Sequence, residues 1–335
     1  MSKDGFREYL AERKLGDDQI AAAISLVERF EASSGAPLEE AGREQLNAFA
    51  AQMIEQKVNE WDHFITLLRY AAFIKNDDIY VAALELIDGA EALETLHRKL
   101  AEEIGEAERD RIFEGIDLPE LGTTNNERPI LTHTVIERMA ATIDREVCIR
   151  ILGSGLRYLE DAWYLDAKRK YEEAGSLDAY LEIKGDEYIA ELEKHRDEGT
   201  LYFNQRITQQ VIDYVEAHPE IRQGVRDGNI LYETKIPHQA IEFLAETDPK
   251  KKTYHYCHCP WVKESLKGND FEIDPVFCNC SAAFHKKSWE VIFGRPLEAE
   301  VLESVLNGDP WCRFAIHLPD DIASSEDIVL SEDDA

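Results

Sequence analysis

The cysteines of this chain are concentrated in its last quarter, and their spacing constrains how that part can fold. Five of the six cysteines fall there, as two Cys-x-Cys pairs and a fifth thiol: Cys257, Cys259, Cys278, Cys280 and Cys312. Thiolates are soft ligands that bind zinc and related metals. If the five sulfurs share one site, segments that are far apart in the sequence must pack together. This cluster is the strongest chemical signal in the chain.

The two Cys-x-Cys pairs predict a metal site if they lie in extended segments. Residues i and i+2 of a strand project from the same face, so each pair would present two sulfurs to one side. A structural zinc ion takes four ligands, and His255, His258 and His285 lie near the five thiols in the sequence. There are therefore more candidate ligands than one ion needs. Zinc is the first interpretation, and redox-active thiols and reduced packing cysteines are the alternatives.

The chain is strongly acidic, which argues against two classes of partner. Its 335 residues carry a formal net charge of −31, from 68 acidic and 37 basic side chains. That charge repels phosphate backbones and anionic lipid headgroups, so nucleic acid is not an expected partner. No apolar run approaches the roughly 18 residues of a membrane span, and the first residues lead into a charged helix. We therefore expect no membrane association and a cytoplasmic location, where thiols serve metal or redox sites more often than disulfides.

Helical periodicity dominates the chain before about residue 245. Turn formers at 118–129 predict a linker, and the C-terminal end carries acids without a base. Cys148 stands alone in a helical stretch and is expected to be a buried small apolar residue. The expected regions are a helical domain at 1–125, a mostly helical middle region at 130–245, a cysteine-rich part at 246–319 and an acidic flexible tail at 320–335.

Period-two alternation near the C-terminus predicts an antiparallel hairpin. Its strands would be 297–306 and 311–318, joined by Asn307-Gly308-Asp309-Pro310. In the second strand, alternation places Cys312, Phe314, Ile316 and Leu318 on one face. The expected fold class is therefore α+β. Mostly helical N-terminal and middle regions precede a C-terminal α/β cysteine-rich domain that contains this hairpin.

The same segment resembles a known type of domain. The residues that carry the resemblance are Cys280-Ser281-Ala282-Ala283-Phe284, Phe293-Gly294-Arg295-Pro296-Leu297, Glu303, Asn307-Gly308-Asp309 and Trp311-Cys312-Arg313-Phe314. They resemble the C-terminal half of 4-vinyl reductase-type domains, which include ligand-sensing modules, and the related amino-thiazoline carboxylate hydrolases. The resemblance is confined to residues 246–319. The 4-vinyl reductase pattern has a cysteine or another ligand in the strand before the glycine turn, where this chain has Ser304, and a second cysteine after it, which this chain keeps as Cys312. An upstream cysteine would have to replace the missing ligand.

Aromatic and histidine side chains around the thiols predict a ligand pocket. The candidate pocket residues are His255, His258, Trp261, Phe284, His285 and Trp289. We expect a zinc-braced module that binds or senses a small apolar or aromatic molecule. Its helical regions would couple it to a partner or form a homodimer. The alternative is a hydrolase that acts on a small amide or thiazoline-type substrate through a metal-bound water or a cysteine nucleophile.

Overall fold

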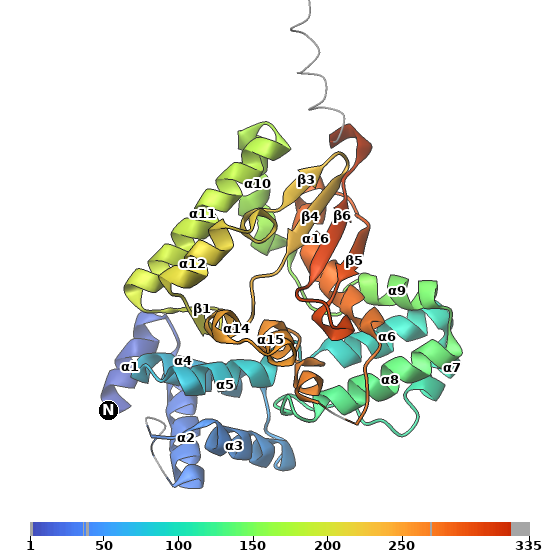
Figure 1. Ribbon diagram of the computed structural model, residues 1–335. Coiled ribbons are helices and arrows are strands. Elements are labelled where there is room, and N and C mark those ends of the chain that lie inside the picture. The colour runs from blue at the N-terminus through green and yellow to red at the C-terminus, as the bar shows by residue number, and fades with distance from the viewer. Residues whose placement is uncertain (1–2, 36, 38–39, 269, 323–335) are drawn as a thin grey trace, which may run out of the picture. The chain divides into compact units, whose positions relative to one another are not determined.

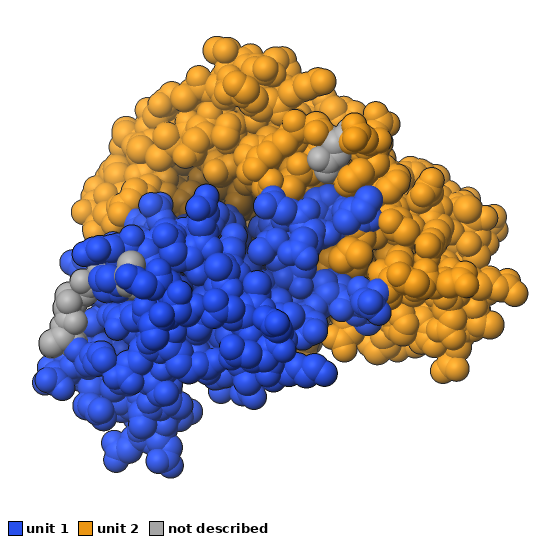
Figure 2. Space-filling view, turned by 90° about the horizontal axis from the view of Figure 1, so that it is seen from below, with its two compact units in different colours: residues 1–90, 117–130 blue, residues 91–116, 131–335 orange. Residues whose placement is uncertain are grey.

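The computed structural model describes residues 3–35, 37, 40–268 and 270–322 of the chain (Figure 1). The acidic tail expected at 320–335 therefore lies largely outside the described residues. The chain forms two compact units, one of residues 1–90 and 117–130 and the other of residues 91–116 and 131–335 (Figure 2). None of the helices in the described ranges is both long enough and apolar enough to cross a membrane.

The first unit is a bundle of short helices. These are α1 (Lys3–Glu12), α2 (Asp17–Ser34), α3 (Arg43–Glu55), α4 (Trp61–Ile74) and α5 (Asp77–Ile87). Their apolar faces meet in one core, in which the ring of Phe6 packs edge-on against Tyr70 at 4.7 Å between centroids. The segment 117–130 also belongs to this unit. Its Arg128 is almost fully buried and donates hydrogen bonds to the carbonyl oxygens of Leu86 and Asp88.

The second unit is also mostly helical. Its longer helices are α6 (Ala92–Ile104), α7 (Glu106–Ile112), α8 (Arg128–Thr142, which begins in the first unit), α9 (Arg145–Gly153), α10 (Leu165–Ala174), α11 (Leu177–Glu198), α12 (Gln209–Glu216), α15 (Pro249–Tyr256) and α16 (Asn279–Phe293). Shorter helical turns are η1 (Asp161–Tyr164), α13 (Pro219–Arg222), α14 (Ala240–Ala245), η2 (Lys263–Lys267), η3 (Pro275–Cys278) and η4 (Val305–Asn307). Cys148 on α9 is buried, as expected.

Two antiparallel sheets complete the second unit. A two-stranded sheet pairs β1 (Leu201–Tyr202) with β2 (Gln205–Arg206). The other sheet has the strand order β3-β4-β6-β5, from β3 (Val225–Asp227), β4 (Ile230–Thr234), β6 (Arg313–His317) and β5 (Ala299–Glu303). The pairing of β5 with β6 confirms the predicted hairpin, although η4 occupies the end of its expected first strand. The sheet thus joins strands from the middle and C-terminal regions.

Helix α16 packs against this sheet and positions the site described below. Its Trp289 and Ile292 share a core with Leu231 of β4 and Ile316 of β6. Figure 1 shows α16 running alongside β4, β5 and β6. Phe314, Ile316 and Leu318 are buried, as the alternation in this strand predicts. The fold class expected from the sequence is confirmed: a mostly helical chain with a small antiparallel sheet toward its C-terminus.

Gly122 offers a test of the packing in the first unit. Its φ is +96°, and an added Cβ would lie 2.6 Å from Cζ of the buried Phe64. Gly122→Ala combines backbone strain with overpacking, so we expect it to lower the free energy of unfolding by about 2–4 kcal/mol. Gly35→Ala is the control, because Gly35 has a φ of +68° in the same unit and open space around it. Gly35→Ala should lower the free energy of unfolding by about 1 kcal/mol. Urea unfolding measures both, and equal losses would contradict the packing described.

Candidate functional site

The five C-terminal cysteines occupy helix ends and loops rather than strands. Cys257 caps the end of α15, Cys278 is the last residue of η3, and Cys280 lies in the first turn of α16. Cys259 lies in the loop after α15, and Cys312 directly precedes β6. The extended geometry expected for the Cys-x-Cys pairs is therefore wrong for Cys278 and Cys280, whereas the backbone of Cys257 is extended after the end of α15. Successive helical residues are rotated by about 100°, so Cys278 and Cys280 point in nearly opposite directions.

Four of these thiols share one buried region. Burial raises the pKa of Cys257 to about 11. Burial also raises the pKa of Cys278 well above its ordinary value, and Cys312, Cys259 and Cys257 raise it further. The sulfur of Cys278 lies 3.0 Å from the hydroxyl oxygen of Ser304. These thiols are therefore protonated near neutral pH.

The thiols are nevertheless not arranged around a common centre. Among the residues that the structure describes, no group of three or more Cys, His, Asp or Glu side chains is placed to hold a metal ion. All six cysteines are present as thiols without a disulfide. Zinc binding by these cysteines stays a prediction.

The histidines expected in a ligand pocket make other contacts. Nε2 of His258 lies 2.6 Å from the carbonyl oxygen of Ile236, and Nδ1 of His255 lies 3.2 Å from Oε1 of Gln239. Burial, reinforced by the charge of Lys235, lowers the pKa of His258 to about 3. His258 is therefore neutral. Trp261 and Trp289 are fully buried in two different cores.

His285 belongs to a buried network around Glu233 of β4. The carboxylate of Glu233 accepts hydrogen bonds from Nδ1 of His285 (2.9 Å), Nε1 of Trp289 (3.2 Å) and Nζ of Lys184 (2.7 Å). Burial opposes ionisation of this carboxyl group, but the Lys184 ammonium and the His285 hydrogen bond outweigh it and lower the pKa of Glu233 to about 2. Burial lowers the pKa of His285. The network therefore consists of a carboxylate, an ammonium and a neutral imidazole.

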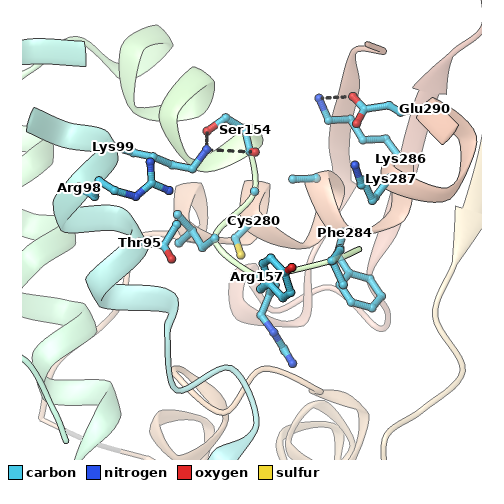
Figure 3. Close-up of a pocket in the computed structure, with 15 residues that line it drawn as sticks. Thr95, Arg98, Lys99, Ser154, Arg157, Cys280, Phe284, Lys286, Lys287 and Glu290 are labelled. Atoms are coloured by element: carbon cyan, nitrogen blue, oxygen red, sulfur yellow. Dashed lines mark hydrogen bonds and ion pairs between the residues drawn. The ribbon is translucent and has the colours of Figure 1, made fainter. Parts of the chain in front are cut away.

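A cavity of about 310 Å³ opens on the other side of α16, inside the second unit (Figure 3). It is formed by α6, by the loop after α9 and by α16. Its lining residues are Thr95, Arg98, Lys99, Ser154, Gly155, Leu156, Arg157, Tyr158, Leu159, Cys280, Ala283, Phe284, Lys286, Lys287 and Glu290. Of the six residues predicted to form a ligand pocket, Phe284 lines this cavity and the other five do not. Of the five predicted metal-binding cysteines, Cys280 lines it and the other four do not.

The cavity lining is basic although the chain is acidic. Five of its side chains are cations, Arg98, Lys99, Arg157, Lys286 and Lys287, and a single one, Glu290, is an acid. Helical spacing explains part of this arrangement, because residues three and four apart share a face. Thr95, Arg98 and Lys99 face the cavity from α6, and Ala283, Lys286, Lys287 and Glu290 face it from α16.

Ion pairs compensate four of these five cations. Arg98 pairs with Glu102, Arg157 with Glu91, Lys286 with Glu290 and Lys287 with Asp161. Within the described ranges Lys99 pairs with no carboxylate, and its ammonium donates to Oγ (2.8 Å) and the carbonyl oxygen (3.3 Å) of Ser154. Figure 3 draws both contacts.

Lys99 is partly buried and lies among other cations of the cavity. Burial lowers its pKa, and the like charges of Arg98 and Lys286 lower it further, while Glu102 and Glu103 oppose the shift. An anion bound in the cavity would raise the pKa of Lys99 again, because a nearby opposite charge favours the ammonium form.

Cys280 is the thiol on the cavity side of α16. Burial raises its pKa, whereas the backbone N–H of Leu156 and the charges of Arg157 and Lys235 act in the opposite direction. Nζ of Lys235 lies 3.1 Å from the hydroxyl oxygen of the adjacent Ser281. The sulfur of Cys280 therefore lies against the same loop that supplies Arg157 to the cavity.

Sequence reasoning missed the basic side chains of this site. The sequence signal that could have indicated these residues is the two pairs of adjacent cations, Arg98-Lys99 and Lys286-Lys287, in an otherwise acidic chain. Their convergence depends on the packing of α6 and α16 around the loop at 154–159. No periodicity within either helix encodes that packing.

No protein family matches the chain, and neither the curated proteins nor the solved structures contain a significant match. The resemblance of residues 246–319 to 4-vinyl reductase-type domains stays a prediction. The functional argument therefore rests on the cavity itself.

Glu233 gives a test of the network that holds α16. We expect Glu233→Gln to lower the free energy of unfolding by about 3 kcal/mol near neutral pH, because it leaves a partly buried ammonium without its carboxylate. The folded-state pKa of Glu233 is lowered to about 2. Its contribution is thus fully present above the ordinary pKa of 4.5 and is lost as the pH falls toward 2. The difference in the free energy of unfolding between wild type and Glu233→Gln should therefore decrease as the pH falls from 4.5 toward 2.

The control for this variant is Glu298→Gln, which removes an exposed carboxylate beside the same sheet. Its free energy of unfolding should stay within about 0.5 kcal/mol of wild type. Chemical denaturation between pH 7 and pH 2.5 measures all three proteins. A Glu233→Gln gap that stays constant with pH would contradict the assignment of an ionised carboxylate.

Proposed function

We propose that this protein binds a small anionic molecule in the cavity between α6, the loop at 154–159 and α16. The observation that carries the proposal is the set of five cations around a cavity of about 310 Å³ in a chain of net charge −31. Solvated faces of so acidic a protein would be expected to be acidic as well. Clustering of the opposite sign at a concave site favours an anionic ligand.

The size and composition of the cavity suit a small molecule. Ligand pockets usually have volumes of about 300–1,000 Å³ and combine apolar surface with a few polar groups. This cavity is near the lower limit, and Tyr158 and Phe284 contribute exposed aromatic surface to it. The sequence suggested an apolar or aromatic ligand. The cations add the requirement for a negative charge.

Lys99 is the residue that we expect to contact the anion. Its neighbours Arg98, Lys286 and Lys287 already have carboxylate partners, whereas Lys99 donates to neutral oxygens of Ser154. Charge-assisted hydrogen bonds are about twice as strong as neutral ones. Exchange of the Ser154 contacts for an anionic oxygen is therefore favourable, and the serine hydroxyl can contact the same ligand.

A hydrolase fits the site less well. A cysteine nucleophile needs a base within hydrogen-bond reach. His255, His258 and His285 contact Gln239, the carbonyl of Ile236 and Glu233, and none of them lines the cavity. Binding without turnover is the function that these contacts support.

A structural zinc ion is the second candidate, and it concerns Cys257, Cys259, Cys278 and Cys312. What favours it is the electrostatic interaction of Cys278 with the other three, which places four thiols in one buried region. Zinc would replace the protons that burial holds on these thiols, and the binding energy would add to the folding energy. The side chains would have to turn toward one centre to coordinate the ion. Cys280 faces the cavity and would not be a ligand.

The anion proposal is tested with Lys99→Gln. Thermal shift with inorganic phosphate, sulfate and small dicarboxylates should show stabilisation of the wild type. We expect the apparent affinity of the variant to fall by about tenfold or more, because one charge-assisted hydrogen bond is lost. Affinity should also fall as the pH rises through the Lys99 pKa, which lies below 10.5, since the neutral amine no longer attracts an anion.

Lys194→Gln is the matched control, because it removes the same charge from an exposed position on α11. It should bind these anions as the wild type does. Equal stabilisation of wild type and Lys99→Gln by every anion, or no stabilisation at all, would sink the proposal.

The zinc candidate is tested by metal analysis of protein purified without added metal. We expect Cys278→Ser to lose the ion and to melt at a lower temperature. Cys280→Ser should retain the ion, and Cys148→Ser serves as a control outside the cluster. Wild type without zinc, or equal loss of zinc from both α16 variants, would rule out the four-thiol assignment.

A further inference from the structure

Cys280 differs from the other C-terminal thiols in that it lines the cavity. It also packs against the core that Cys259 and Cys312 contact. Cys278 contacts Ser304 and interacts with Cys257, Cys259 and Cys312. Cys280, two residues later on the same helix, lines the cavity instead. Figure 3 shows its sulfur pointing toward the loop that carries Arg157. A small molecule in this cavity can therefore contact Cys280.

The groups around this thiol favour a negatively charged reaction partner. Lys99 and Arg157 line the same cavity, the backbone N–H of Leu156 points at the sulfur, and Lys235 interacts with it electrostatically. Fixed positive charges of this kind raise the local concentration of anions. They also stabilise the anionic thiolate that leaves when the disulfide is attacked.

We propose that Cys280 undergoes thiol–disulfide exchange with a small anionic disulfide that enters this cavity. The proposal rests on the anion-binding function proposed above and extends it to covalent chemistry. The Cys280 thiol loses its proton to solvent, and its sulfur attacks one sulfur of the disulfide. A new S–S bond to Cys280 forms as the S–S bond of the reagent breaks, and the released thiolate takes up a proton. The disulfide is the oxidant, and no other reactant is needed.

The resulting mixed disulfide would place its anionic group beside Lys99. The cavity of about 310 Å³ has room for such an adduct. The four other C-terminal thiols do not line the cavity, so a molecule bound there contacts Cys280 and not these thiols. The position of Cys280 in the fold thus determines which thiol reacts, and the charge of the cavity determines which disulfide reacts fastest.

The experiment compares three disulfides of different charge on the native full-length protein. The anionic reagent is 5,5′-dithiobis(2-nitrobenzoate), the neutral reagent is 2,2′-dithiodipyridine and the cationic reagent is cystamine. Each rate is divided by the rate of the same reagent with a small free thiol. We expect one thiol to react in a phase faster than that of the other cysteines, with an anionic advantage of about tenfold or more at low salt. Salt should reduce that advantage because it screens the charges.

Peptide mapping of the wild-type adduct by mass spectrometry identifies the modified residue without any variant. It should be Cys280. Cys280→Ser should lose the fast phase, Lys99→Gln should lose most of the anionic advantage, and Lys194→Gln should keep both. Inorganic phosphate should slow the anionic reagent by competition.

Modification of another cysteine, or no fast phase with any reagent, would overturn the proposal. An anionic advantage that survives in Lys99→Gln and at high salt would also overturn it. If phosphate still stabilises the wild type in those cases, the anion-binding function stands and the exchange alone fails. If phosphate does not stabilise it, both fail.

Discussion

The buried carboxylate of Glu233 holds the C-terminal half of the second unit together. It lies on β4 and receives hydrogen bonds from His285 and Trp289, both on α16, and from Lys184 on α11. A carboxylate in such a position must be compensated by charge and hydrogen bonds, or it costs several kcal/mol. Because its three partners come from two helices, this requirement fixes α11 and α16 on the sheet at once.

The position of α16 in turn determines which of its faces packs on the sheet and which borders the cavity. The face that carries His285 and Trp289 packs on the sheet, whereas the face that carries Phe284 and Lys287 borders the cavity. Its first turn carries Cys280, and Cys278 caps it. The two candidate sites therefore share one helix.

The sequence predicted those features that depend on local periodicity. The hairpin followed from the alternation in 311–318, which places Phe314 and Ile316 on one face, and both are buried. The burial of Cys148 followed from its place on an amphipathic helix. The geometry of Cys278 and Cys280 was wrong because a spacing of two residues has the same appearance in a strand and in a helix. The cavity could not be predicted, since Lys99, Arg157 and Lys286 come from three separate parts of the chain.

The contrast between an acidic chain and a basic cavity has a kinetic consequence. Within about a Debye length of the surface an approaching anion is repelled by the net charge of −31, and the cations of the cavity attract it only at shorter range. Added salt screens the attraction, so a bound anion leaves faster as the ionic strength rises. Such a site retains its occupant longest when the surrounding solution is least saline.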